Sequence, residues 1–113
     1  MAEPKELTEI NDLNEVWKAS EESPVLLFKL STTCPINAEA FKEYTTFLNN
    51  DDPNRDAYFV KIQEARNVSD EIAKELNVQH ESPQLFIIKN GEQVWHTSEN
   101  ITAEKIVEAL EEV

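Results

Sequence analysis

Hydrophobic residues follow several different spacings along this chain of 113 residues, and three short segments have the pattern of strands. Residues 25–30 and 57–62 are almost continuously apolar, which is typical of strands that are buried on both faces of a parallel sheet. Residues 5–10 predict a short strand at one edge of that sheet. We therefore expect residues 25–30 to lie at the centre of the sheet.

Two more strands are predicted close together in the last third of the chain. Residues 84–89 and 92–96 flank Asn90-Gly91, a pair that favours tight turns with positive φ at both central positions. The sequence therefore predicts an antiparallel hairpin at this point.

Four segments repeat apolar residues at intervals of three and four, which is the spacing of one face of an α-helix. Asn11, Asn67 and Thr102 are suited to cap a helix start, and Pro35 is suited to the first turn of a helix. We expect the first helix to end at Ser20 and the second near residue 49. The side chains expected to pack inward are Leu13, Val16, Trp17, Phe41, Tyr44, Thr45, Leu48, Val68, Ile72, Ala73, Leu76, Ile106, Val107 and Leu110.

The order of these elements predicts the fold class. Strands that are separated by helices favour parallel pairing with right-handed connections, whereas the hairpin adds antiparallel strands. We therefore expect an α/β fold with one domain over residues 1–113, in which helices flank a central mixed β-sheet on both faces. In such folds ligands bind beyond the carboxyl end of a central strand, here the strand over residues 25–30.

Charge and composition exclude several classes of function. Ten Lys and Arg against 23 Asp and Glu give a net charge of −13, which disfavours nucleic acids and anionic membranes as partners. No apolar run approaches the roughly 18 residues that span a bilayer, and no secretory signal is evident, so we expect a cytoplasmic protein. A single cysteine and two histidines predict no metal site.

The candidate chemistry lies at Cys34, between the predicted central strand and the helix that begins at Pro35. Unpaired backbone N–H groups and the helix dipole at such a position lower the pKa of a cysteine and favour the nucleophilic thiolate. The hydroxyls of Ser31, Thr32 and Thr33 are further candidate donors to the sulfur. A free cysteine is also often a buried and inert core residue, but this context favours a reactive one.

Neither histidine is predicted to complete a hydrolase site with the cysteine. A hydrolytic triad needs a histidine that is oriented by an acid, and no such partner is evident in the sequence around His80 or His96. His96 ends an amphipathic strand and is predicted to lie at the surface, whereas Trp95 is predicted to pack beneath a helix.

Three motifs stand out along the chain: Cys34-Pro35-Ile36-Asn37 at a helix start, Ser82-Pro83 before a strand, and Asn90-Gly91 within the hairpin. Together they resemble the thioredoxin superfamily over nearly the whole chain. More narrowly, Thr33-Cys34-Pro35-Ile36 with Ser82-Pro83-Gln84 is similar to the monothiol bacilliredoxin family of the YtxJ type, whose motif reads Thr-Cys-Pro-Ile-Ser. Asn37 stands where that family usually has Ser and where dithiol thioredoxins have a second cysteine.

The resemblance implies a thioredoxin-like fold and thiol–disulfide exchange, with Cys34 as the catalytic nucleophile. It also implies a cis peptide bond between Ser82 and Pro83, which would place the Ser82 backbone opposite the sulfur. The substrate-binding residues that the resemblance implies are Thr33, Pro35, Ile36, Asn37, Ser82 and Pro83.

The likeness to bacilliredoxins further implies the substrate. Cys34 would take bacillithiol from mixed disulfides on cytosolic client proteins, and a second bacillithiol molecule would resolve the adduct, with no bound cofactor. We expect the protein to act as a monomer. Because bacillithiol carries carboxylates, a chain with a net charge of −13 is expected to have a local electropositive spot at the helix start.

Two alternatives stay open at the level of sequence. The first is a redox-silent thioredoxin-like module that binds a protein segment in a groove beside Pro83, with apolar contacts from Ile36 and Trp95. The second is an iron–sulfur cluster shared between two chains, with Cys34 and an external thiol among its ligands.

Overall fold

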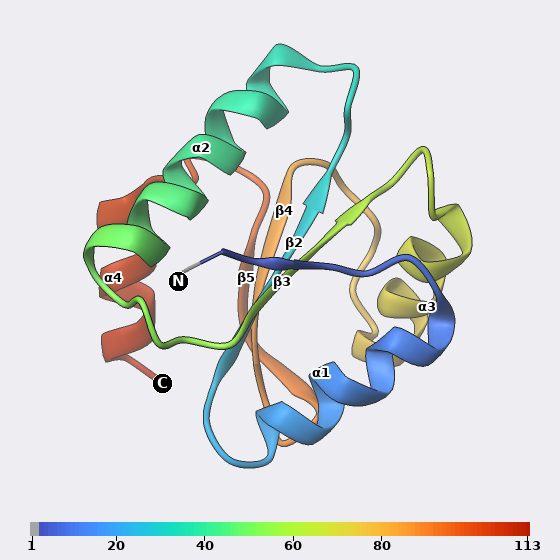
Figure 1. Ribbon diagram of the computed structural model, residues 1–113, viewed down its shortest axis with the longest axis horizontal. Coiled ribbons are helices and arrows are strands. Elements are labelled where there is room, and N and C mark those ends of the chain that lie inside the picture. The colour runs from blue at the N-terminus through green and yellow to red at the C-terminus, as the bar shows by residue number, and fades with distance from the viewer. Residues whose placement is uncertain (1–2) are drawn as a thin grey trace.

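A five-stranded mixed sheet lies between two layers of helices in the computed structural model, which describes residues 3–113 (Figure 1). The elements are β1 (Lys5–Glu6), a 3-10 turn (Ile10–Asp12), α1 (Leu13–Ser20), β2 (Val25–Leu30), α2 (Pro35–Asn50), β3 (Ala57–Lys61), α3 (Arg66–Leu76), β4 (Gln84–Lys89), β5 (Glu92–Thr97) and α4 (Ala103–Glu111). The predicted α/β fold with helices on both faces is therefore confirmed. Met1 and Ala2 of the predicted domain lie outside the described residues.

The sheet has the order β1-β3-β2-β4-β5, so β2 is its central strand as predicted. β2 pairs in parallel with β3 and antiparallel with β4, and β5 pairs antiparallel with β4. Residues 25–29 are all buried, because side chains alternate between the two faces of a sheet and helices cover both faces. This double burial explains why the strand is apolar without alternation.

Helices α2 and α4 cover one face of the sheet (Figure 1). Phe28 from β2 stacks on Tyr44 of α2 with ring centroids 5.2 Å apart, and Phe41 meets Phe28 edge-on at 5.4 Å. The buried Tyr44 hydroxyl donates a hydrogen bond of 2.9 Å to the backbone carbonyl of Tyr58 in β3. These aromatic contacts fix α2, and with it the start of that helix, over the central strands.

Helices α1 and α3 cover the opposite face (Figure 1). Val16 of α1 and Ile72 of α3 are fully buried in the same core cluster as Val25 and Leu27, two of the odd-numbered side chains of β2. The hairpin joins this layer, because the backbone N–H of Asn90 donates to the Ser20 carbonyl over 2.8 Å. Helices therefore cover both faces of the sheet.

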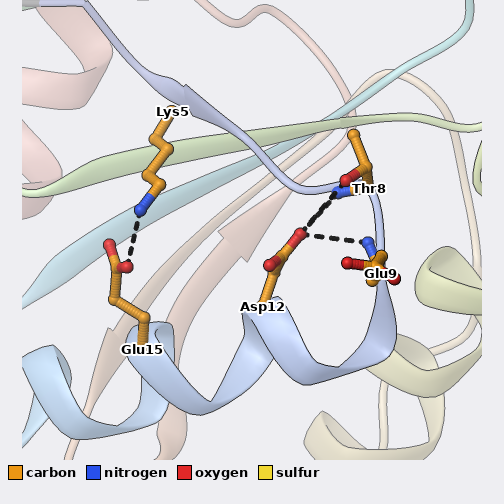
Figure 2. Close-up of polar contacts among 5 residues, drawn as sticks. All are labelled: Lys5, Thr8, Glu9, Asp12 and Glu15. Carbon is orange, nitrogen blue, oxygen red and sulfur yellow. Dashed lines mark hydrogen bonds and ion pairs between the residues drawn. The ribbon is translucent and has the colours of Figure 1, made fainter.

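The N-terminal strand is shorter than predicted, because Asp12 turns the chain after residue 7. The Asp12 carboxylate accepts hydrogen bonds from the backbone N–H groups of Thr8 and Glu9 over 2.9 and 3.0 Å (Figure 2). These bonds lower the pKa of Asp12 and use the donors that a longer strand would need. Asn11, the predicted cap, lies inside the resulting 3-10 turn, and α1 begins two residues later.

Other predicted helix and hairpin starts have mixed outcomes. Asn67 does not cap α3: the helix begins at Arg66, so Asn67 lies in its first turn. Thr102 caps α4 as predicted, with its hydroxyl oxygen accepting from the Lys105 N–H over 3.1 Å. Asn90 and Gly91 have φ values of 54° and 75°, which confirms the predicted turn.

The aromatic contact under α2 gives a test of this packing. Phe28→Ala is expected to lower the free energy of unfolding by about 3–5 kcal/mol, because it leaves a cavity between β2 and α2. Urea denaturation measures the change. Ile36→Ala is the matched control, since that side chain is 67% exposed and its loss should change stability by less than about 0.5 kcal/mol. Equal effects of the two substitutions would contradict the assigned packing.

Candidate active site

Cys34 occupies the junction between β2 and α2. Its backbone is extended (φ −115°, ψ 122°) and it is the N-cap of α2, whose first residue is Pro35. The cysteine is partly exposed, and its carbonyl accepts from the Asn37 N–H over 3.1 Å. The predicted position at a helix start beyond the central strand is confirmed, and the partly exposed sulfur lies where α2 presents its first backbone N–H groups.

The helix start lowers the pKa of the Cys34 thiol. The largest cause is the backbone N–H of Ile36, followed by the backbone N–H and then the side chain of Asn37. Each of these donors stabilises the thiolate relative to the thiol, because a sulfur with negative charge is the stronger hydrogen-bond acceptor. The site therefore favours the nucleophilic form of the sulfur.

Asn37 also closes the loop that leads to the cysteine. Only 1% of this residue is exposed, although it lies in the first turn of α2. Its side-chain Oδ1 accepts a hydrogen bond of 2.9 Å from the backbone N–H of Ser31. One buried amide thus joins the end of β2 to the start of α2 and also acts on the sulfur.

The hydroxyls before the cysteine have a different role from the predicted one. Gln63, which follows β3, donates to Ser31 Oγ over 2.7 Å and accepts from the backbone N–H of Thr32 over 3.0 Å. Thr33 Oγ1 lies 3.3 Å from both Ser31 Oγ and Gln63 Nε2. The prediction that these hydroxyls donate to the sulfur is wrong, since the groups that lower the pKa of Cys34 lie in α2.

Gln63 was not identified as a site residue from the sequence. A signal for it existed, because β2 and β3 are parallel neighbours and their carboxyl ends meet at one edge of the sheet. A polar side chain directly after β3 is therefore placed to contact the loop after β2.

A groove of about 940 Å³ lies beside the start of α2, and Ile36, two residues after the cysteine, is one of its lining residues. Ile36, Ser82 and Pro83 line it together, although more than 40 residues separate Ile36 from the other two along the chain. The Ser82–Pro83 peptide bond is cis, as the resemblance implied. Ile36 is 67% exposed, which leaves an apolar side chain free at the rim. The structure thus brings together the two motifs that the sequence keeps apart.

The charged side chains that line this groove are mainly acidic. Glu39, Glu43 and Glu99 line the groove with one cation, Lys42. Backbone N–H groups contribute positive potential at the helix start, and the lining carboxylates oppose it. The electropositive spot at the helix start stays a prediction, and the face of α2 beyond its first turn carries acids into the groove beside it.

The remaining predicted features lie as follows. Trp95 is half-buried against the core on the face that α2 and α4 cover, and His96 is exposed, as predicted for both. Among residues 3–113, no three His, Cys, Asp or Glu side chains gather as a metal site would need. No helix in the described part of the chain is long and apolar enough to cross a membrane.

Comparisons with known proteins agree with this geometry. A family model for monothiol bacilliredoxin BrxC matches residues 5–106. A solved thioredoxin-fold protein that is proposed to be an oxidoreductase is 37% identical, with a TM-score of 0.82, and the match covers 94% of this chain and 92% of that one.

More distant matches show the fold alone. Thioredoxin from Fasciola hepatica is 15% identical with a TM-score of 0.75, covering 96% of this chain and 97% of that chain. Oxidised thioredoxin O2 from Arabidopsis thaliana is 18% identical with a TM-score of 0.74, covering 99% and 95%. With one cysteine at the start of α2, a thioredoxin fold and a family match over most of its length, the chain belongs to the monothiol bacilliredoxins, a family of thioredoxin-like oxidoreductases.

Proposed function

We propose that this protein removes bacillithiol from mixed disulfides on client proteins, with Cys34 as the sole redox-active residue. The observation that carries the proposal is a single partly exposed thiol whose pKa is lowered at the N-terminus of α2. Family membership supports the identity of the small thiol, because monothiol bacilliredoxins take their name from it. A chain with one cysteine forms no internal disulfide, so an external thiol completes each cycle.

The first step is an exchange of one disulfide for another. The Cys34 thiolate attacks the bacillithiol sulfur of the mixed disulfide, and a new sulfur–sulfur bond forms between them as the old one breaks. The client leaves as a thiolate that takes a proton from water. The client cysteine is reduced, and the protein now carries bacillithiol on Cys34.

The second step restores the protein. The thiolate of a free bacillithiol attacks the bacillithiol sulfur of the adduct, which releases the Cys34 thiolate and one molecule of bacillithiol disulfide. The net reaction converts a modified client and one bacillithiol into a reduced client and the disulfide, so electrons balance without a bound cofactor. The N–H groups of Ile36 and Asn37 favour this step, because they stabilise Cys34 as the leaving thiolate.

The other site residues are proposed to bind and orient the disulfide. Pro35 fixes the first turn of α2, and Thr33 holds the preceding loop through its contact with Gln63. Ile36, Ser82 and Pro83 line the groove in which we place the chain of the client. We further propose that the chain works as a single domain and a monomer, in the cytoplasm, where bacillithiol would be reduced.

Cys34→Ala is expected to abolish client release. The wild type, mixed with a bacillithiolated client and free bacillithiol, should release the client thiol and show the bacillithiol adduct on Cys34 by intact mass. Cys34→Ser, which keeps the size and polarity of the side chain, should bind the same client without releasing it. Equal release by wild type and Cys34→Ala would remove the redox function and leave the protein-binding alternative.

Asn37→Ala is expected to raise the pKa of Cys34, because it removes a side-chain donor to the thiolate. The rate of Cys34 alkylation against pH measures the midpoint, which should move upward from the wild-type value. Asn37→Ser, which keeps a short hydroxyl donor, should fall between the two. Ile36→Ala is the control, since the backbone N–H of residue 36 remains. An unchanged midpoint in Asn37→Ala would refute the assigned contact.

Charge in the groove should slow the entry of bacillithiol. Replacing both Glu39 and Glu99 by Gln is expected to speed resolution of the adduct by about twofold to threefold at low ionic strength, because fewer carboxylates repel an anionic thiol. The gain should vanish near 0.5 M salt, roughly where screening is complete. The control replaces two exposed residues by Gln, Glu21 at the end of α1 and Glu75 on α3, which makes the same change in net charge. A similar gain in both double variants would show that the groove has no special effect.

A further inference from the structure

Lys29 is a buried cation that the proposed reaction does not use. It lies in β2 with 0% of its surface exposed, on the face of the sheet covered by α1 and α3. Burial lowers its pKa to about 8, against an opposing effect of the Asp70 carboxylate, so the side chain is still an ammonium group at neutral pH. A buried ammonium is costly unless it is hydrogen-bonded, so its partner shows what the cation holds in place.

That partner is His80, in the loop between α3 and β4. Lys29 Nζ lies 3.1 Å from His80 Nδ1, and Ser69 Oγ lies 3.3 Å from the same ring nitrogen. An ammonium group only donates, so Nδ1 accepts and the neutral ring carries its proton on Nε2. The exposed imidazole therefore receives a hydrogen bond from a cation fixed in the central strand.

Gln84 holds the same loop from the neighbouring strand. It is fully buried and is the Cα partner of Lys29 across the β2–β4 pair, so both side chains lie on one face of the sheet. Its Nε2 donates to the Gln79 carbonyl over 3.1 Å, and its Oε1 accepts from the Glu81 N–H at 3.4 Å. Together with the Lys29–His80 bond, these contacts fix three consecutive residues, 79–81, directly before Ser82 and Pro83.

We propose that Lys29 and His80 are positioning residues that hold the loop over residues 79–83 against the groove. The proposal rests on the proposed function, because Ser82 and Pro83 at the end of this loop line the groove assigned to the client. Lys29 acts on alignment and not on the sulfur: the groups that lower the pKa of Cys34 all belong to α2.

Variants of His80 test the proposal, because this side chain is exposed and its replacement does not empty the core. His80→Leu removes the acceptor for Lys29, whereas His80→Asn places an amide oxygen near the position of Nδ1. Hydrogen exchange of the amides of residues 79–82 should be roughly fivefold to tenfold faster in His80→Leu, as expected for the loss of one charge-assisted bond, and close to wild type in His80→Asn.

Kinetics separate positioning from a general loss of structure. His80→Leu should raise KM for the bacillithiolated client roughly fivefold with little change in kcat, and His80→Asn should restore KM. The alkylation midpoint of Cys34 should be the same in all three proteins. The proposal would be overturned if His80→Leu kept the wild-type exchange rates and the wild-type KM. It would also be overturned if a shift of the Cys34 alkylation midpoint accounted for the lost activity.

Acid provides a second readout of the same bond. Burial, Lys29 and Arg66 lower the pKa of His80 below its usual 6.5, while Asp70 and Glu81 raise it. Protonation of His80 puts a hydrogen on Nδ1 and a second cation beside Lys29, which breaks the bond. The bond is therefore intact above pH 6.5 and is lost as the pH falls through the lowered pKa of His80. Protection of residues 79–82 should fall in acid in the wild type and stay level in His80→Asn. Equal acid dependence in both would also overturn the proposal.

The outcome for the loop is independent of the outcome for the reaction. If the wild type releases no client, the proposed function fails, whereas hydrogen exchange still decides whether Lys29 and His80 hold residues 79–83. If the wild type is active and its loop is unaffected by His80→Leu, only the positioning role fails.

Discussion

The structure depends on the burial of β2 on both of its faces. Phe28 packs under α2 on one side, and Val25 and Leu27 pack under α1 and α3 on the other. A strand held in this way ends at a fixed point, and the helix that follows begins five residues later. The N–H groups of α2 are therefore directed at Cys34 by the packing of the core, and the lowered pKa of the thiol follows from that placement.

The electrostatics of the site combine a short-range attraction and a longer-range repulsion. Backbone donors at the start of α2 favour negative charge on one sulfur, whereas Glu39, Glu43 and Glu99 disfavour anions in the adjacent groove. The two effects act on different species. The first activates the thiolate and helps it to leave, and the second limits the approach of an anionic small thiol more than that of a neutral or basic protein segment.

Three buried polar side chains hold the two loops that form the site. Asn37 joins the end of β2 to α2, and Gln84 fixes the loop before Pro83. Lys29 reaches the same loop through His80. Burial of each of these polar side chains costs free energy that its hydrogen bonds offset. Each bond joins a loop to a neighbouring element, which non-directional hydrophobic packing does not do. Non-directional burial builds the sheet, and directional bonds fix the loops around the sulfur.

Hydrophobic spacing and local turn chemistry were enough to predict most elements, because they are set by neighbours in the chain: the continuous apolar run of β2, the Asn90-Gly91 turn and the Thr102 cap were all confirmed. The edge strand was confirmed but is shorter than predicted, because the Asp12 carboxylate accepts from the backbone N–H groups that would extend it. The predicted cap at Asn67 was wrong, because α3 begins at Arg66. The sequence by itself determined a single thiol at the start of a helix after a buried strand. Only the tertiary structure decided three features: the acidic groups in the lining of the groove, the contact of Gln63 with the active-site loop, and the bond between Lys29 and His80. The physical reason is that each feature joins segments 30 or more residues apart, which meet only when the sheet is formed.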